Sequence, residues 1–221
     1  MGIDMEKLIL FDLDGTLTES GEGIMKSVQY ALGKMGKPEP DLQKLRVFIG
    51  PPLLEQFMKY AGMSREEAKQ AVSCYHERFT AKGMFENRPY PGIPEMLETL
   101  KKNGFLLAVA SSKPEKFVIQ ILEHFHIKKY FDEVAGSEMD GSRSKKVDVI
   151  EEVLRRLGRS AAKDRILMVG DKEHDVIGAR EAKIPCVAVA YGYGTMEELE
   201  AAGPLKIVHT VAKLQEYLVS V

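Results

Sequence analysis

The spacing of hydrophobic and polar residues along the chain divides it into two regions. A short apolar run, LILF, belongs to a predicted strand over about Lys7–Asp12, since an unbroken apolar run of this length is typical of a buried strand. From Gly21 to Gly83 apolar residues recur at helical spacing and no convincing strand is predicted. After about residue 94, predicted strands and helices alternate to the end of the sequence. The pattern therefore predicts an all-helical insertion after the first strand.

The insertion carries local signals for helix ends. In SREEAKQAVSCYHERF, Ser64 and Glu67 have the spacing of a capping box, in which each side chain satisfies a backbone amide at the helix start. Pro51 and Pro52 suit the first turn of another helix, where a missing amide hydrogen is tolerated. The segment NRPYPGIP breaks the periodicity and is predicted to be the linker that returns to the first region.

The region after this linker has the alternating pattern of a parallel α/β sheet. Its predicted elements are helix Pro94–Asn103, strand 105–111, a helix from Pro114, strand Phe131–Ala135, helix Lys146–Leu157, strand 165–170, helix Asp175–Lys183, strand 186–191, helix Met196–Ala202, strand 206–209 and a last helix. Nearly continuous apolar strands between helices indicate a sheet covered on both faces. The predicted fold class is α/β, a Rossmann-like parallel sheet with a smaller helical cap. The predicted domains are a core of residues 1–16 and 88–221, and a cap of residues 17–87.

Composition argues against several classes of protein: nucleic-acid-binding, membrane-associated, and zinc- or disulfide-stabilised. The 221 residues carry a net charge of −2, which gives no electrostatic basis for binding a nucleic-acid backbone or an anionic membrane. The sequence has no apolar run of membrane-spanning length and no signal-peptide pattern near Met1. Cys74 and Cys186 lack the spacing of a zinc site or disulfide framework. We expect a cytoplasmic monomer with a small-molecule partner.

Polar residues gather where the predicted strands end. They are Asp12, Asp14, Ser111, Ser112, Lys113, Lys145, Lys146, Asp171 and Asp175. Ligands of open α/β sheets bind beyond the carboxyl ends of strands, so these side chains are candidates for one site. Asp12 and Asp14 are two apart on an extended segment and face the same side, and Gly15 lets the chain turn away.

Clustered carboxylates repel one another unless a cation neutralises them. Oxygen ligands with room for water and phosphate oxygens favour Mg²⁺. One carboxylate can then attack phosphorus, while a second works as an acid and base. A serine hydroxyl and a lysine can bind the phosphoryl oxygens.

The segments DLDGTLTES, VASSK, a lysine before a helix, and GDKEHD resemble, in order, the four motifs of the haloacid dehalogenase (HAD) superfamily of phosphohydrolases. The helical insertion resembles the C1-type cap of that superfamily. YPGIPEMLETLKKNG, GSRSKKVDVI and YGYGTMEELEAAG resemble its phosphoglycolate-phosphatase-like and 5'-nucleotidase-like branch. The resemblance implies a Mg²⁺-dependent phosphatase acting on small phosphomonoesters, with nucleoside 5'-monophosphates and 2-phosphoglycolate as the leading substrates.

The resemblance also implies roles for individual residues. Asp12 is the expected nucleophile, and Asp14 the general acid/base whose backbone carbonyl contacts the metal. Ser111 and Lys146 are expected on the phosphate, and Asp12 and Asp171 on Mg²⁺. Asp175 is expected to support the metal from outside its ligand shell. Residues placed near the substrate by position alone are Ser112, Lys113, Arg46 and Gly50.

Two features depart from the motifs of many relatives. At the third motif two lysines precede Val147, so that Lys145 is an alternative to Lys146. At the second motif Ser112 stands where many relatives have asparagine, so the contact usually made by that amide is in question. YGYG, residues 191–194, is interpreted as a tight turn that ends a strand, with a place lining the cleft as the alternative.

Other functions compete with hydrolysis. A β-phosphoglucomutase-like phosphotransferase shares this cap type, but IGPPL lacks the arginine expected in its cap loop, although Arg46 is near in sequence. A dehalogenase would not need metal-binding aspartates. A catalytically idle binding or regulatory protein on the same fold would be expected to lose a motif carboxylate, and Asp12, Asp14 and Asp171 are all present.

Overall fold

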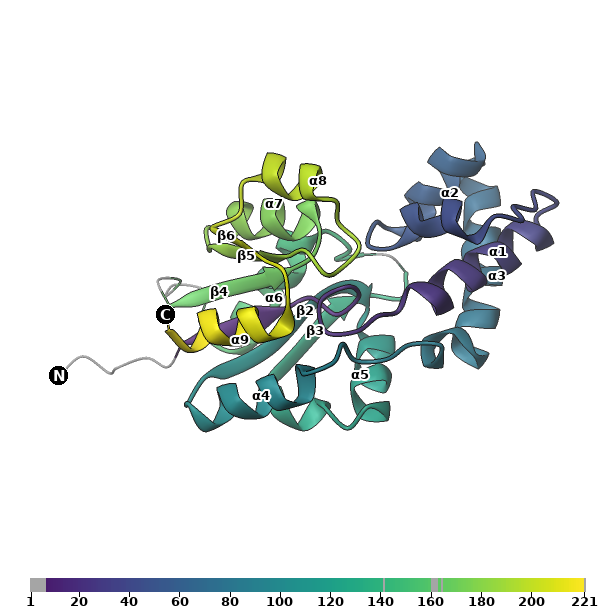
Figure 1. Cartoon of the computed structure of the whole chain (residues 1–221). Coiled ribbons are helices and arrows are strands. Elements are labelled where there is room, and N and C mark those ends of the chain that lie inside the picture. The colour runs from purple at the N-terminus through teal and green to yellow at the C-terminus, as the bar shows by residue number, and fades with distance from the viewer. Residues whose placement is uncertain (1–6, 141, 160–162, 164, 221) are drawn as a thin grey trace. The chain divides into compact units, whose positions relative to one another are not determined.

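The computed structural model describes residues 7–140, 142–159, 163 and 165–220 (Figure 1). The chain divides into two compact units. One unit consists of Met1–Thr18 and Pro89–Val221, and the other of Glu19–Arg88. The first unit contains a sheet with helices, and the second is helical.

A six-stranded parallel sheet forms the centre of the first unit. Its strands are β1 (Leu8–Phe11), β2 (Leu106–Pro114), β3 (Glu133–Ser137), β4 (Ile166–Gly170), β5 (Cys186–Val189) and β6 (Lys206–Val208). They lie in the order β3-β2-β1-β4-β5-β6, so β1 is central and has β2 and β4 as its neighbours. The carboxyl ends of these three strands therefore meet at one edge of the sheet.

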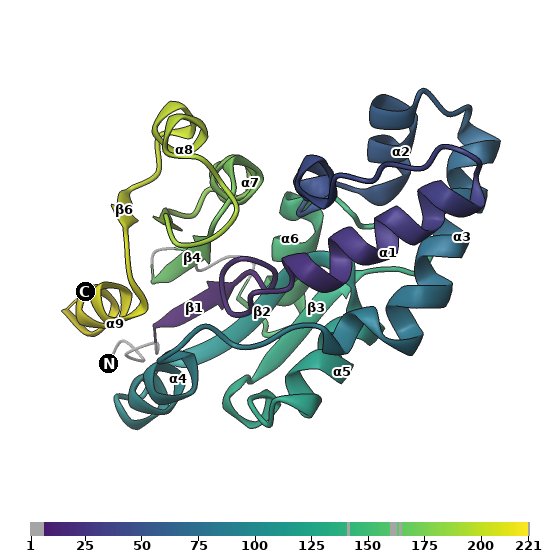
Figure 2. The same ribbon diagram turned by 45° about the vertical axis from the view of Figure 1, so that its right-hand side comes forward.

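Helices cover both faces of this sheet (Figure 2). The helices of this unit are α4 (Ile93–Lys102), α5 (Glu115–His124), α6 (Lys146–Arg156), α7 (Glu173–Glu181), α8 (Met196–Ala202) and α9 (Val211–Ser220), with a short 3₁₀ helix, η3 (Lys128–Tyr130). Figure 2 shows α6 and α7 on one side of the sheet and α4, α5 and α9 on the other. All four side chains of β1 are at most 2% exposed, because both of its faces are covered. The predicted fold class is confirmed.

The second unit contains only helical elements within residues 19–88. They are α1 (Gly21–Lys34), η1 (Leu42–Phe48), α2 (Leu53–Ala61), α3 (Arg65–Ala81) and η2 (Gly83–Phe85). The predicted capping box is confirmed, because Glu67 accepts a hydrogen bond from the Ser64 amide at 2.8 Å and its own amide donates to Ser64 Oγ at 3.3 Å. Pro51 and Pro52 lie just before α2, so their predicted place in its first turn is wrong.

Several predicted boundaries in the sheet unit need correction, among them the end of the second strand, which continues to Pro114 and not only to residue 111. Two corrections have a clear local cause. The third strand begins at Glu133 and not at Phe131, because the Phe131 amide bonds to Lys128 O and still belongs to the turn that ends η3. Helix α7 begins at Glu173 and not at Asp175. Asp175 lies inside the first turn, where its carboxylate accepts the Lys172 amide at 3.0 Å and so satisfies a backbone donor at the helix start.

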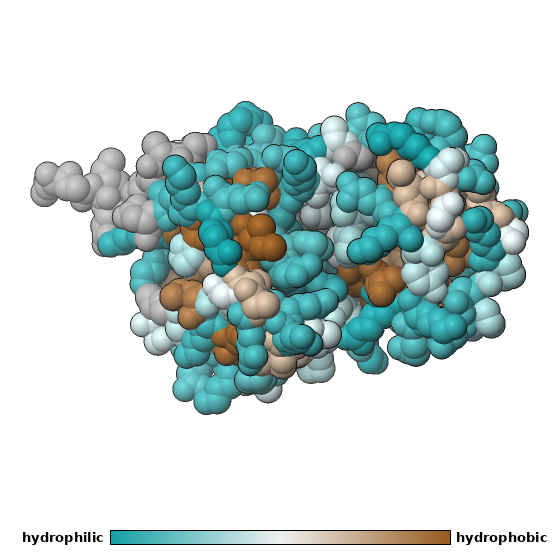
Figure 3. Space-filling view, turned by 90° about the horizontal axis from the view of Figure 1, so that it is seen from above, coloured by the Kyte–Doolittle hydropathy of each residue, from teal (hydrophilic) through white to brown (hydrophobic). Residues whose placement is uncertain are grey.

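In the space-filling view the visible surface is mostly hydrophilic, with separate patches of hydrophobic residues (Figure 3). Among the described residues, no helix combines the length and apolar character needed to cross a membrane.

Candidate active site

The candidate site lies at the carboxyl ends of the central strands of the sheet unit. Asp12 follows β1, and its amide donates to Val169 O at 2.9 Å, which fixes the chain beside β4. Asp171 follows β4 directly. The strand order changes direction here, since the chain proceeds from β1 towards β3 on one side and later from β4 towards β6 on the other. Such an edge is the usual ligand site of open α/β sheets.

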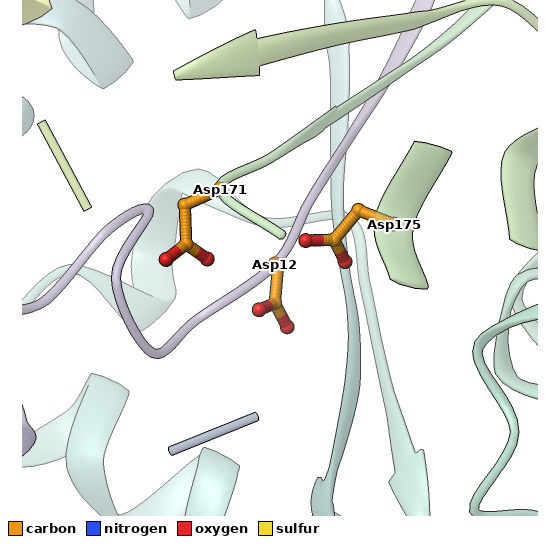
Figure 4. A group of neighbouring side chains, drawn as sticks. All are labelled: Asp12, Asp171 and Asp175. Atoms are coloured by element: carbon orange, nitrogen blue, oxygen red, sulfur yellow. The ribbon is translucent and has the colours of Figure 1, made fainter. Parts of the chain in front are cut away.

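Asp12, Asp171 and Asp175 form a buried group of carboxylates (Figure 4). One oxygen from each side chain lies within 4.8 Å of the others, and Figure 4 shows Asp12 between the other two. The three come from the end of β1, the end of β4 and the first turn of α7. The carboxylate of Asp175, which is predicted to support the metal from outside its ligand shell, lies in the same group as those of Asp12 and Asp171.

Lys146, the first residue of α6, supplies the positive charge in this group. Its Nζ lies 2.8 Å from Asp12 Oδ1 and 2.8 Å from Asp175 Oδ1, and it donates to Ala110 O at 2.9 Å. Burial opposes the charge of Lys146, but the carboxylates of Asp12 and Asp175 outweigh burial and raise its pKa. Lys145, the alternative motif residue, is exposed at the position before α6. Of the two lysines, Lys146 is the one that reaches the carboxylates.

When all three carboxylates are ionised, they carry more negative charge than Lys146 can balance. Burial raises the pKa of Asp12 to about 6, with the neighbouring Asp175 and Asp14 charges adding to the effect and Lys146 opposing it. Burial and the charges of Asp175 and Asp12 raise the pKa of Asp171 well above its ordinary value. Three carboxylates against one ammonium leave two negative charges, which a divalent cation would neutralise. Oxygen donors at this spacing fit Mg²⁺.

Asp14 is held separately from the carboxylate group. Its two oxygens accept hydrogen bonds from Lys113 Nζ at 2.8 and 2.6 Å. Lys113 is in β2, which also carries Ser111 and Ser112. Ser111 is 2% exposed, and its Oγ accepts the Lys113 amide at 3.4 Å. Each aspartate of the first motif therefore forms an ion pair with its own lysine: Asp12 with Lys146, and Asp14 with Lys113.

The remaining candidates belong to the helical unit. Arg46 lies in η1, and Gly50 lies between η1 and α2 with φ of 104°, a conformation that favours glycine. For both residues, contact with the substrate stays a prediction.

The segment 191–194, predicted to be a tight turn with a place lining the cleft as the alternative, contacts the residues of this site. The Tyr193 amide donates to Asp171 Oδ2 at 2.7 Å, and Tyr191 Oη donates to Thr16 O at 3.0 Å. The two glycines of YGYG were the available signal, because glycines after a strand often allow close approach of two backbone segments.

Comparison with known proteins identifies the family. A model described as haloacid dehalogenase-like hydrolase matches residues 9–189. The chain belongs to the haloacid dehalogenase-like hydrolase family. The predicted resemblance is therefore confirmed, and with it the assignment of the chain as a HAD-type phosphatase.

Individual members of the family differ in their described activities. A 5'-nucleotidase of Pseudomonas aeruginosa is 45% identical over 212 residues, which cover 96% of this chain and 95% of the relative. A tyrosine-protein kinase PtkA of Mycobacterium tuberculosis is 38% identical over 214 residues, which cover 96% of this chain and 72% of the relative. The crystal structure of a predicted phosphatase from Clostridium acetobutylicum is 46% identical, with a TM-score of 0.94, and covers 99% of this chain and 100% of its own.

Proposed function

We propose that the protein is a Mg²⁺-dependent phosphomonoester hydrolase that works through a phosphorylated Asp12. The observation that carries the proposal is the position of Asp12, between two further buried carboxylates and in contact with Lys146. The Asp12 carboxylate contacts the ammonium group of Lys146, and together with Asp171 and Asp175 it forms a group that suits a divalent metal. A weak nucleophile in such surroundings can react with a phosphoryl group whose charge is neutralised.

The residues have the following proposed roles. Asp12 and Asp171, together with the backbone carbonyl of Asp14, would hold Mg²⁺, and Asp175 would support it. When bound, Mg²⁺ neutralises the charge on the phosphoryl oxygens and on the carboxylates. Ser111 donates a hydrogen bond to a phosphoryl oxygen, and Lys146 places its positive charge near another.

The reaction has two balanced steps. A carboxylate oxygen of Asp12 attacks phosphorus, the bond from phosphorus to the ester oxygen breaks, and that oxygen leaves as an alcohol with a proton from Asp14. Water then attacks phosphorus while Asp14 accepts a water proton. The bond from phosphorus to Asp12 breaks, inorganic phosphate leaves, and both aspartates return to their starting states.

Nucleoside 5'-monophosphates are the first proposed substrates, on the strength of the 45% identical 5'-nucleotidase, and 2-phosphoglycolate is the second. The helical unit is proposed to act as a cap that contributes substrate contacts, with Arg46 and Gly50 as candidates there. Ser112 and Lys113 are the corresponding candidates in β2.

A phosphotransferase is the alternative function. The 38% identical relative PtkA favours this alternative, because it is described as a tyrosine-protein kinase, an enzyme that transfers a phosphoryl group to a tyrosine. In chemical terms the second step would use an acceptor hydroxyl in place of water. The retained Asp12, Asp14 and Asp171 disfavour an idle binding protein.

The test is phosphate release from nucleoside 5'-monophosphates, 2-phosphoglycolate and hexose phosphates, each with Mg²⁺ and with a chelator. We expect metal-dependent release that is strongest for the nucleotides. Asp12→Asn should fold and lose activity by on the order of 10³-fold or more, because an amide is a poor nucleophile. Asp148→Asn, an exposed change in α6, is the matched control and should keep full activity.

Two results would contradict the proposal. Phosphate release that persists unchanged in chelator would contradict the role of the metal. Near-normal turnover of Asp12→Asn would contradict the role of Asp12 as nucleophile. Absence of release together with phosphorylation of an added tyrosine peptide or sugar would favour the phosphotransferase.

A further inference from the structure

The segment after β5, which we term the GYG loop (Tyr191–Gly194), encloses one carboxylate of the candidate metal group. The Tyr193 amide donates to Asp171 Oδ2 at 2.7 Å, while Thr16 Oγ1 lies 3.4 Å from Asp171 Oδ1. Asp171 is 0% exposed. Both oxygens of this side chain are therefore oriented by protein donors from two different segments.

Glycines allow the loop to approach Asp171 this closely. A Cβ atom at Gly192 would lie 2.4 Å from Asp171 Cβ and 2.4 Å from Gly15 O. A Cβ atom at Gly194 would lie 2.1 Å from Asp171 O, and one at Gly15 would lie 2.1 Å from Asp171 Oδ2. Because two of these contacts are to backbone oxygens, the neighbours could not move aside without shifting the chain.

Tyr191, the first residue of the same loop, contacts the segment after β1 and the ring of Tyr90. Its hydroxyl donates to Thr16 O at 3.0 Å, and its ring packs edge-on against Tyr90 with ring centroids 4.9 Å apart. Thr16 follows Asp12 and Asp14 by only a few residues. The GYG loop is thus tied to both segments that carry the proposed metal ligands, the one after β1 and the one after β4.

We propose that the GYG loop is a positioning device that sets the affinity of the site for its divalent metal by fixing the orientation of Asp171. The inference rests on the proposed function, because it takes Asp171 as a ligand. A carboxylate already held in its binding orientation loses little side-chain freedom when the metal arrives. Groups that orient metal ligands in this way commonly change metal affinity by about 10- to 100-fold when they are removed.

A merely structural loop would behave differently. Its disruption would lower the thermal stability of the metal-free protein and leave the dissociation constant of the folded protein unchanged. Metal affinity measured on folded protein therefore separates the two roles.

The experiment titrates the full-length chain with Mn²⁺ alone and follows free Mn²⁺ by electron paramagnetic resonance. The variants are Gly192→Ala, which adds a Cβ against Asp171, and Tyr191→Phe, which deletes only the hydroxyl bonded to Thr16. Gly33→Ala is the control, since a Cβ at this exposed position of α1 has nothing within 4 Å. Asp171→Asn identifies the binding that belongs to this site. Circular dichroism verifies that each variant is folded.

We expect about 10- to 100-fold weaker Mn²⁺ binding for Gly192→Ala and a smaller, severalfold weakening for Tyr191→Phe, with wild-type binding for Gly33→Ala. If Gly192→Ala does not fold, the severalfold change in Tyr191→Phe decides the question. Wild-type affinity in every folded loop variant would overturn the inference and leave the proposed function intact. If Asp171→Asn binds Mn²⁺ as tightly as the wild type, both the inference and the proposed metal site are wrong.

Discussion

Lys113 Nζ bonds to both carboxylate oxygens of Asp14, at 2.8 and 2.6 Å. The side chains are 7% and 11% exposed, so the pair is largely removed from water. Lys113 is predicted to lie near the substrate, and in the structure its ammonium group contacts Asp14, the proposed acid/base. The orientation of Asp14 is therefore held from β2, the strand that also carries Ser111.

Replacing Lys113 should affect substrates according to their leaving groups. Lys113→Met releases Asp14, so proton donation to the leaving oxygen should become less efficient. Positioned general acids typically contribute about 10²- to 10⁴-fold. We expect turnover of an alkyl phosphate, which needs the proton, to fall at least about tenfold more than turnover of p-nitrophenyl phosphate. Lys116→Met, at an exposed position of α5, is the control. Equal losses for both substrates would contradict a role through Asp14.

Removing Lys146 should destabilise the protein as well as inactivate it. Lys146→Met leaves Asp12 and Asp175 buried without their ammonium partner, and an unpaired buried charge typically costs about 3–5 kcal/mol. We expect a loss of that size in the free energy of unfolding, measured with urea in the absence of Mg²⁺. Lys145→Met changes the exposed neighbour and should alter stability by less than about 0.5 kcal/mol. Similar effects of the two substitutions would contradict the assignment of Lys146.

Mg²⁺ should stabilise the folded chain. Binding to the native protein alone adds about 2.7 kcal/mol when the ion is present at one hundred times its dissociation constant. The melting temperature should therefore rise with Mg²⁺ concentration and return to its starting value with chelator. In Asp171→Asn the rise should be much smaller, while Asp148→Asn should respond like the wild type. A rise of the same size in Asp171→Asn would place the stabilising ion elsewhere.

An ion-pair network on α6 should contribute to acid sensitivity. Hydrogen bonds from Arg155 and then Arg156 lower the pKa of Glu152 from 4.5 to about 2. Because the folded value is the lower one, the stabilisation is fully present above pH 4.5 and is lost as the pH falls towards about 2. We expect Glu152→Gln to be less stable than the wild type near neutral pH, with the difference vanishing at about pH 2. Thermal unfolding of both proteins across this range measures it, and a constant difference would refute it.

The sequence by itself determined the local elements and the chemical kind of the site. Apolar runs marked the strands, the Ser64 and Glu67 spacing marked the start of α3, and the motif after the first strand marked the family. These features depend on neighbouring residues or on short, specific segments. The predicted boundaries were wrong where a local hydrogen bond decides them, as at Phe131 and Asp175.

The tertiary structure decided which side chains meet. Three contacts show this. Lys146, and not Lys145, bonds to Asp12, which is 134 positions away in the sequence. Lys113 bonds to Asp14 across 99 positions, and Tyr191 bonds to Thr16 across 175. Such contacts follow from the strand order, which sets β1 between β2 and β4 and brings the loop after β5 against Asp171. Hydrophobic periodicity specifies which face of a strand is buried, but it carries no information on which strand lies beside it.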